Sequence, residues 1–430
     1  MKRLFFTLSV LLVASMFLAA CGPAPTAVAT EAPATAAPAT EASATEAPVV
    51  DTTALCASDA GGCAVFAAGA PIKIGFAGPM SGDVSAFGID ASQGIDIAFT
   101  DAGAFEGHAF VQDPQDDQAS PEVGATVAQL FASDPTVVGV VGHLFSGATN
   151  AAMPIYEAAF LPMVSPSATG ISLTQQGNTV FNRVVGNDKF QGALAANFVF
   201  TNLGLKKLAI VHDGGTYGLG LAERTREVFT ELGGEVVAFQ GIETGGTDYN
   251  AVLADVASNS PDALFFGGYT GEAAVIRNQM AGAGMAGATF VSDDGIYGSQ
   301  FVELAGANSA GVYATSAGRP AGSTAVSEFD AKFLDAYGVA TGSLSPYSWY
   351  SNTTAMVLVE AIRKVGVAGA DGNLYIPRAA LVAAVRATSG YQGLIGEITC
   401  DPTGECGTGG FAVYGVQTGS WVELAPDYTP

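Results

Sequence analysis

The chain of 430 residues contains few charged residues, and those of positive sign are especially scarce. Only 13% of its residues are charged, and 16 Lys and Arg stand against 40 Asp and Glu, which gives a formal net charge of −24. Such acidity argues against binding of nucleic acid or anionic lipid through a basic surface. The low charge, together with 55 glycines, favours a tightly packed α/β protein over a disordered one.

Common catalytic motifs are also missing. The sequence has no phosphate-binding Gly-rich loop ending in Lys-Ser/Thr, no His-Glu-x-x-His and no nucleophile elbow. Its only histidines are His108, His143 and His212. Because His143 lies three residues before Ser146, an exported serine hydrolase is the one enzyme alternative. We expect no catalytic residue, no cofactor and no metal.

Four of the five cysteines form two close pairs, Cys56 with Cys63 and Cys400 with Cys406. In an exported chain, an even number of paired cysteines indicates small disulfide loops. Zinc bound by the four thiolates is the alternative, but neither pair has the shorter spacing usual in zinc sites. Two disulfides are therefore predicted.

The N-terminus predicts export and lipid anchoring. Lys2 and Arg3 precede an apolar run over residues 4–20, and Leu18-Ala19-Ala20-Cys21 resembles a bacterial lipobox. Residues 1–20 are therefore predicted to be a lipoprotein signal peptide, and Cys21 to be lipidated at the outer face of the cytoplasmic membrane. An uncleaved membrane anchor is the alternative, although the run is marginal against the ~20 apolar residues of a spanning helix.

A low-complexity segment follows over residues 21–50, made almost entirely of Ala, Pro, Thr and Glu after the cysteine. It has too little apolar surface to offset the chain entropy lost on folding. We expect a disordered tether between the lipid and the folded part; a plain spacer is the alternative.

From about residue 71 onward, short runs rich in Val, Ile and Phe alternate with amphipathic stretches. Ser120, Pro121 and Glu122 are typical of a helix start, and Val123, Val127, Leu130 and Phe131 give that helix an apolar stripe. Alternating strands and helices predict parallel sheets with right-handed crossovers. The expected strands are 72–77, 136–141, 161–164, 208–211, 263–266 and 289–291, and 411–416 with 420–424 forms a hairpin that turns at Gly419.

Polar clusters follow five of these strands directly. They begin at Gly142, Ser165, His212, Gly267 and Ser292. Since ligands bind beyond the carboxyl ends of strands in open parallel sheets, the five loops predict a binding cleft.

Charge suggests a role for each side chain of this cleft. Ser146 and Thr169 can donate hydrogen bonds to a carboxylate, Asp294 or Asp293 can accept from an ammonium group, and Tyr217 and Tyr269 can close over the ligand. The alternatives are structural, since Ser and Thr also cap helices, Asp stabilises turns and Tyr packs at edges.

At these residues the sequence resembles the periplasmic binding proteins for branched-chain amino acids, of the Leu/Ile/Val-binding type. The likeness runs from about Pro71 to the C-terminus. It is densest in Gly78-Pro79-Met80-Ser81-Gly82, Val141-Gly142-His143-Leu144, Ile155-Tyr156-Glu157, Ser165-Pro166-Ser167-Ala168-Thr169, Ala209-Ile210-Val211-His212-Asp213 and Phe266-Gly267-Gly268-Tyr269.

The resemblance implies an α/β fold of two doubly wound parallel-sheet lobes joined by a three-crossing hinge. One lobe would comprise residues 71–187 plus 318–390, and the other 188–317 plus 391–430. Ser146 and Thr169 would hold the ligand carboxylate. Ser167 would offer its carbonyl to the ammonium group, and Tyr217 and Tyr269 would approach from the second lobe.

Three positions depart from the family pattern. Asp294 stands where the family usually has glutamate, which shortens its reach toward the ammonium group. Phe87 replaces a tyrosine of some members, so the cleft loses a hydroxyl. Phe145 replaces a cysteine, and its expected partner loop, Gln115-Asp116-Asp117-Gln118, has none, so that disulfide is absent.

The resemblance also implies an ABC permease with a separate ATPase as the partner, and an amino acid of the aliphatic or branched-chain class as the cargo. Two alternatives keep the fold. One replaces the ligand by an amide, urea, aromatic acid or short peptide, and the other makes the chain a ligand sensor for a receptor.

Overall fold

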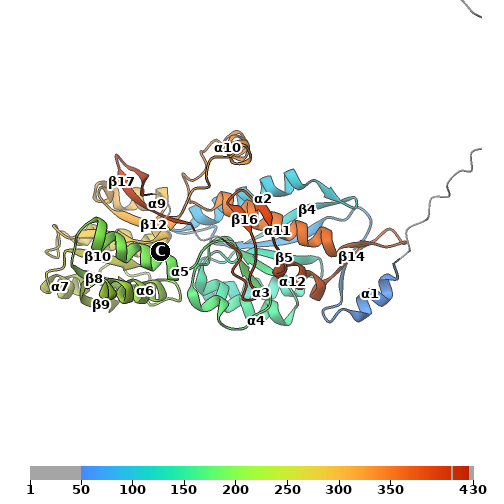
Figure 1. Cartoon of the computed structure of the whole chain (residues 1–430), viewed down its shortest axis with the longest axis horizontal. Helices are drawn as coiled ribbons and strands as arrows, with labels where there is room; N and C mark the ends of the chain where they lie inside the picture. The colour runs from blue at the N-terminus through green and yellow to red at the C-terminus, as the bar shows by residue number, and fades with distance from the viewer. Residues whose placement is uncertain (1–49, 408–409, 426–430) are drawn as a thin grey trace, which may run out of the picture. The chain divides into compact units, whose positions relative to one another are not determined.

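The computed structural model describes residues 50–407 and 410–425, which belong to one compact unit (Figure 1). The predicted signal peptide, Cys21 and almost all of the predicted tether lie outside the described residues.

The first large sheet has six strands in the order β3-β4-β2-β5-β6-β7, and all neighbours except β3 and β4 are parallel. Alternate residues of its central strands enter different cores: Ile74 and Val138 pack with α2 and α11, whereas Ala77 and Val137 pack with α3 and α4. Helices thus cover both faces. The bounds are β2 Ile72–Gly78, β3 Ala104–Phe105, β4 His108–Asp116, β5 Val137–Gly142, β6 Met163–Ser165, β7 Phe181–Arg183, α2 Ser85–Ala102, α3 Pro121–Ser133, α4 Ser146–Ala158, α11 Ser348–Val365 and α12 Arg378–Arg386.

The second large sheet has seven strands in the order β18-β17-β12-β11-β10-β8-β9, and its last two chain segments, β17 and β18, run antiparallel. Leu264 and Phe266 pack with α7, α8 and α9, while Ala263 and Phe265 pack with α5 and α6. The bounds are β8 Lys207–His212, β9 Glu235–Gly241, β10 Ala263–Gly267, β11 Thr289–Ser292, β12 Tyr313–Ala317, β17 Phe411–Gln417, β18 Ser420–Ala425, α5 Asp188–Asn197, α6 Gly218–Glu231, α7 Asn250–Ser258, α8 Thr270–Gln279 and α9 Ser299–Ala305.

The two sheets repeat one strand order. β4-β2-β5-β6-β7 and β9-β8-β10-β11-β12 both follow the doubly wound order 2-1-3-4-5, so the predicted fold class is confirmed. Each expected strand is present to within two residues, and the predicted hairpin is β17 with β18. Leu130 was assigned wrongly to the buried stripe of α3, since it is 50% exposed while Val127 and Phe131 are buried.

The chain passes between the sheets three times, after β7, after β12 and before β17. The predicted lobe boundaries stay a prediction. The small hairpin of β15 and β16 packs against the core that contains α11, together with Cys400 and Cys406. We therefore place the third boundary of the proposed lobes after Cys406 rather than at residue 390. The remaining bounds are α1 Thr52–Ser58, β1 Cys63–Phe66, α10 Thr324–Tyr337, β13 Val367–Ala368, β14 Leu374–Pro377, β15 Tyr391–Gly393 and β16 Gly396–Ile398.

Both predicted disulfides are present, Cys56–Cys63 and Cys400–Cys406. Their sulfurs are bonded to each other, so the zinc alternative is wrong for these four cysteines.

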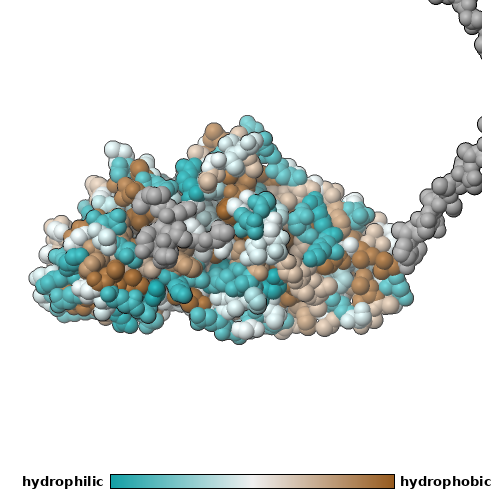
Figure 2. Space-filling model, viewed as in Figure 1, coloured by the Kyte–Doolittle hydropathy of each residue, from teal (hydrophilic) through white to brown (hydrophobic). Residues whose placement is uncertain are grey.

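The visible surface alternates between hydrophilic and hydrophobic areas (Figure 2). Among the described residues, no helix is long and apolar enough to span a membrane.

Asp59 attaches the N-terminal segment to helix α12. Its carboxylate accepts from the backbone N–H groups of Gly61 (2.8 Å), Ala379 (2.9 Å) and Ala380 (2.9 Å). The last two belong to the first turn of α12, whose N–H groups have no partner within the helix. Asp59 therefore caps α12 from a distant part of the sequence.

We expect Asp59→Ala to lower the melting temperature by about 2–5 °C, because loss of a cap costs about 1–2 kcal/mol. Circular dichroism melting checks this. The matched control is Asp51→Ala, since Asp51 caps only the exposed helix α1 through the N–H of Ala54. Equal melting temperatures of the two variants would contradict the cap.

Candidate functional site

Five of the predicted ligand residues line one small cavity between the carboxyl ends of the two sheets. Ser146 and Ser167 come from loops after β5 and β6, whereas Tyr217, Tyr269 and Asp294 come from loops after β8, β10 and β11. Leu144 and Phe145 complete the lining. Both sheets thus contribute at their topological switch points, where such folds bind ligands. The cavity is about 10 Å³, the room needed by about one water molecule.

Hydroxyl groups gather on the side of the first sheet. Ser146 is the first residue of α4, and its Oγ accepts from the N–H of Gly170 at 3.1 Å. Ser167 Oγ donates to the carbonyl of Leu144 at 2.7 Å. Thr169 does not line the cavity, and its buried hydroxyl interacts with the carboxyl group of Asp188, whose pKa it lowers. A threonine hydroxyl that turns from Asp188 can donate to a ligand carboxylate.

Asp294 is the centre of the polar contacts on the other side. Its Oδ1 accepts from the Tyr217 hydroxyl at 2.6 Å and from Gln191 Nε2, and its Oδ2 accepts from the Tyr347 hydroxyl at 2.5 Å. Tyr347 precedes α11, which packs on the first sheet, so this last bond joins the two sides of the cleft. An incoming ammonium group would take the place of one of these donors.

Stacked aromatic rings form the wall. The ring centroids of Phe145 and Tyr269 lie 4.3 Å apart, and their planes differ by 4°. Tyr269 also stacks on Tyr217, with 5.3 Å between the ring centroids. Phe87 does not line the cavity. Its ring centroid lies 5.7 Å from that of Phe145 and 6.2 Å from that of Tyr347. Phe87 therefore supports the wall rather than facing the cavity.

A larger cavity of about 780 Å³ adjoins the small one and shares Phe145, Tyr217 and Tyr269 with it. Among its described lining residues are four acids and no Lys, Arg or His. The acids are Asp83, Glu122, Asp213 and Glu272. This outer cavity therefore disfavours groups of negative charge.

Burial raises the pKa of several carboxyl groups around Asp294. Burial, and then the charge of Asp294, raise the pKa of Asp188 to about 8, although a side-chain hydrogen bond from Thr169 and the charge of Arg183 oppose this. The same two causes raise the pKa of Asp293 well above its ordinary value. Burial also raises the pKa of Asp294, against the hydrogen bonds from Tyr217 and Tyr347. Because burial outweighs the opposing contacts of Thr169 and Arg183, the neutral form of Asp188 is favoured.

The site contains residues that the sequence did not reveal. Tyr347, Gln191 and Asp188 lie at or near the starts of helices, not in loops after strands, so the strand-end pattern could not find them. The proline before Tyr347 marks a turn but carries no sign of the contact with Asp294.

The hydrolase alternative is not supported by geometry. His143 is bound through Nδ1 to Asp117 at 2.7 Å and through Nε2 to the Tyr156 hydroxyl at 3.1 Å. Both ring nitrogens are thus occupied by partners other than Ser146, whose Oγ contacts Gly170. A serine nucleophile needs a base within hydrogen-bond reach, and His143 does not provide it.

We expect Asp188→Asn to stabilise the protein increasingly as the pH rises. The folded-state pKa of about 8 lies above the ordinary 3.8, so the wild-type protein loses stability between these values as only the unfolded chain ionises. Asn does not titrate. The melting temperature of the variant minus that of the wild type should rise by about 5 °C from pH 5 to pH 8.5.

The control is Asp248→Asn. Hydrogen bonds from Asn250 lower the pKa of the exposed Asp248, so it does not titrate between pH 5 and pH 8.5. The melting temperature of this variant minus that of the wild type should therefore stay constant over this range. Parallel melting curves for Asp188→Asn and the wild type would contradict the assignment.

Comparisons with known proteins show the family of the chain. The family model described as periplasmic binding protein matches residues 71–420. A Leu/Ile/Val-binding protein homolog of Brucella melitensis is 29% identical over 356 residues, which is 82% of this chain and 92% of that protein. The leucine-, isoleucine-, valine-, threonine- and alanine-binding protein of Pseudomonas aeruginosa is 31% identical over 304 residues, or 69% and 79% of the two chains.

Solved structures are similar over the same region. The leucine-binding protein LivK of Thermotoga maritima matches with a TM-score of 0.74 and 28% identity, over 83% of this chain and 98% of that one. LivJ of Streptococcus pneumoniae, a branched-chain amino acid transporter substrate-binding protein in complex with isoleucine, matches with a TM-score of 0.71 and 25% identity, over 82% and 100%. The chain therefore belongs to the periplasmic binding protein family, as a substrate-binding protein and not an enzyme.

Proposed function

We propose that the chain is a lipid-anchored extracytoplasmic protein that captures an aliphatic amino acid between two lobes and delivers it to an ABC importer. The observation that carries this proposal is the composition of the small cavity. Hydroxyl groups of Ser146 and Ser167 face it from one sheet, and the carboxylate of Asp294 faces it from the other. Groups for a carboxylate and for an ammonium thus lie on opposite sides, as a zwitterion requires.

The relatives support the class of ligand. Those reported above are named for binding leucine, isoleucine and valine, and LivJ holds isoleucine. An acidic side chain on the ligand would find four acids and no basic residue among the described lining of the outer cavity. An aromatic acid without an ammonium group would leave Asp294 without a charged partner.

Ligand capture begins on the first lobe in this proposal. The ligand carboxylate accepts from Ser146 Oγ, from Thr169 Oγ1 and from N–H groups in the first turn of α4, which have no partner within the helix. The carbonyl of Ser167 accepts from the ammonium group. Thr169 is suited to this role because its hydroxyl is buried two residues from Ser167 and can turn from Asp188 to a ligand carboxylate.

Closure of the second lobe completes the site. A cavity of about 10 Å³ is far smaller than an amino acid, so the walls must separate before the ligand enters. Separation breaks the Tyr347–Asp294 bond and the Phe145–Tyr269 stack, which join the two sides. The ligand then shifts the population toward the closed form by giving Asp294 a charged partner.

Export and anchoring rest on the first 21 residues. Lys2, Arg3 and the apolar run form a signal peptide, and Cys21 receives the lipid. The tether then gives the binding domain reach toward a permease in the same membrane.

We expect leucine, isoleucine or valine to raise the melting temperature of the full chain in detergent after removal of carried-over ligand. Asp294→Asn should raise Kd at least about 30-fold, or about 2 kcal/mol, because it removes a charged hydrogen bond to the ammonium group. Isothermal titration calorimetry measures the change.

Asp248→Asn is the control, since it removes the same charge at an exposed turn. An affinity of Asp294→Asn within twofold of the wild type would show that Asp294 does not bind the ammonium group. Stabilisation only by amides, ureas or aromatic acids would replace the proposed ligand.

We expect Cys21→Ala to release the chain from the membrane fraction of an expressing bacterium and to abolish labelling by an alkyne fatty acid, because the acyl chains supply the membrane affinity. Ser43→Ala, within the tether, should change neither result. Continued labelling of Cys21→Ala would rule out this cysteine as the lipid site.

A further inference from the structure

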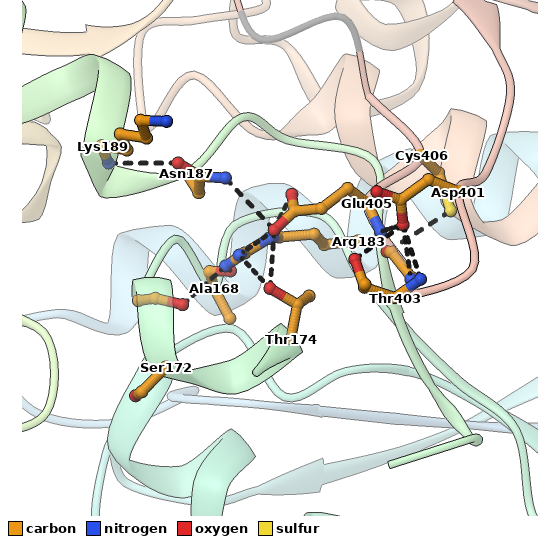
Figure 3. A network of polar contacts seen from close by, with 12 residues as sticks. Ala168, Ser172, Thr174, Arg183, Asn187, Lys189, Asp401, Thr403, Glu405 and Cys406 are labelled. Carbon is orange, nitrogen blue, oxygen red and sulfur yellow. Dashed lines mark hydrogen bonds and ion pairs between the residues drawn. The ribbon is translucent and has the colours of Figure 1, made fainter. Parts of the chain in front are cut away.

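Arg183, the last residue of β7, is fully buried and uses every donor of its guanidinium group (Figure 3). Nε donates to Glu405 Oε2 at 2.9 Å, and Nη2 donates to Glu405 Oε1 and, at 3.1 Å, to Thr174 Oγ1. Nη1 donates to the carbonyls of Ala168 at 3.0 Å and Gly170 at 2.8 Å. Five donors and five acceptors match, which a buried Arg requires.

The two carbonyls lie on either side of Thr169. Gly170 also donates its N–H to Ser146 Oγ. Arg183 therefore fixes the backbone on either side of Thr169, and through Gly170 it also acts on the Ser146 hydroxyl, without lining the cavity itself.

Glu405 is held in turn by the loop closed by Cys400–Cys406. Asp401 Oδ1 accepts from the N–H groups of Thr403, Gly404 and Glu405 within this loop. The loop is also bonded to β7 through its backbone: the N–H of Arg183 donates to Gly404 at 2.9 Å, and the N–H of Cys406 donates to Arg183 at 2.9 Å. The carboxylate of Glu405 accepts further hydrogen bonds from Thr174 (2.7 Å) and Asn187 (3.1 Å).

We propose that Arg183 and Glu405 are positioning residues for the ligand carboxylate, and that the disulfide loop sets ligand affinity by holding Glu405 in place. The idea rests on the proposed function, because it takes Ser146 and Thr169 as carboxylate ligands. Without the charge of Glu405, a buried guanidinium loses its partner and shifts, and the carbonyls of Ala168 and Gly170 shift with it.

The first test needs no ligand. Glu405→Gln in the full chain should speed hydrogen exchange at residues 165–171, where the N–H groups of Ala168 and Gly170 are bonded to Ser165 and Ser146, while the second sheet exchanges as in the wild type. The matched control is Glu397→Gln, which removes the same charge from β16, where Glu397 contacts only Gln392 and Thr399 among the described side chains.

The second test compares L-leucine with L-leucinamide, which lacks the carboxylate. Glu405→Gln should weaken leucine binding about tenfold and leucinamide binding much less, a coupling usual for residues in one network. The double variant Cys400→Ser and Cys406→Ser should weaken leucine binding to a similar degree. Adding Glu405→Gln to this double variant should weaken leucine binding little further. Should Glu405→Gln fail to fold, the cysteine pair provides both tests.

The outcomes separate the two proposals. Unchanged exchange at residues 165–171, or faster exchange spread evenly over the chain, would overturn the positioning role. Equal weakening of leucine and leucinamide would also overturn it. Glu405→Gln could speed exchange at residues 165–171 alone while the wild-type chain binds no amino acid. That result would support the positioning role and refute the proposed ligand.

Discussion

The hydrogen bonds of Asp294 are the interaction on which the closed arrangement depends. Its two oxygens collect donors from three elements: Tyr217 after β8, Gln191 on α5 and Tyr347 before α11. Burial makes an ionised carboxylate costly, so each donor lost on opening must be replaced by water or by a ligand. Because only Tyr347 comes from an element packed on the first sheet, it is the donor that the proposed opening removes.

The strand order that the two sheets share explains which loops line the small cavity. In each sheet, successive strands are added first to one side and then to the other. The change of side falls between β2 and β5 in the first sheet and between β8 and β10 in the second, and the loops that follow these strands diverge there. The β5 and β6 loops supply hydroxyls at a helix start, where a negative group is favoured. The β8, β10 and β11 loops supply rings and carboxyls. In the proposed function, the chemical asymmetry of a zwitterion is thus divided between two sheets of the same topology.

Sequence reasoning succeeded where a feature is local and failed where it depends on tertiary contact. Strand runs, the cap at Ser120 and the loops after strands are local, so the fold class and five cavity residues could be predicted. Tyr347 and Arg183 could not, because their partners are 53 and 222 residues away. Leu130 was misplaced because helical spacing alone does not say how wide a buried face is.

The shorter carboxylate at position 294 and the hydroxyl of Tyr347 act together. Without ligand, that hydroxyl satisfies Asp294 Oδ2 and stabilises closure. A ligand therefore gains only the difference between its ammonium group and a phenol as donors, not the full value of a new bond. Since closure is driven by differential affinity for the two states, the charge of the ammonium group must provide that difference. Neutral ligands of similar shape would exchange one uncharged donor for another, and so would close the cleft weakly.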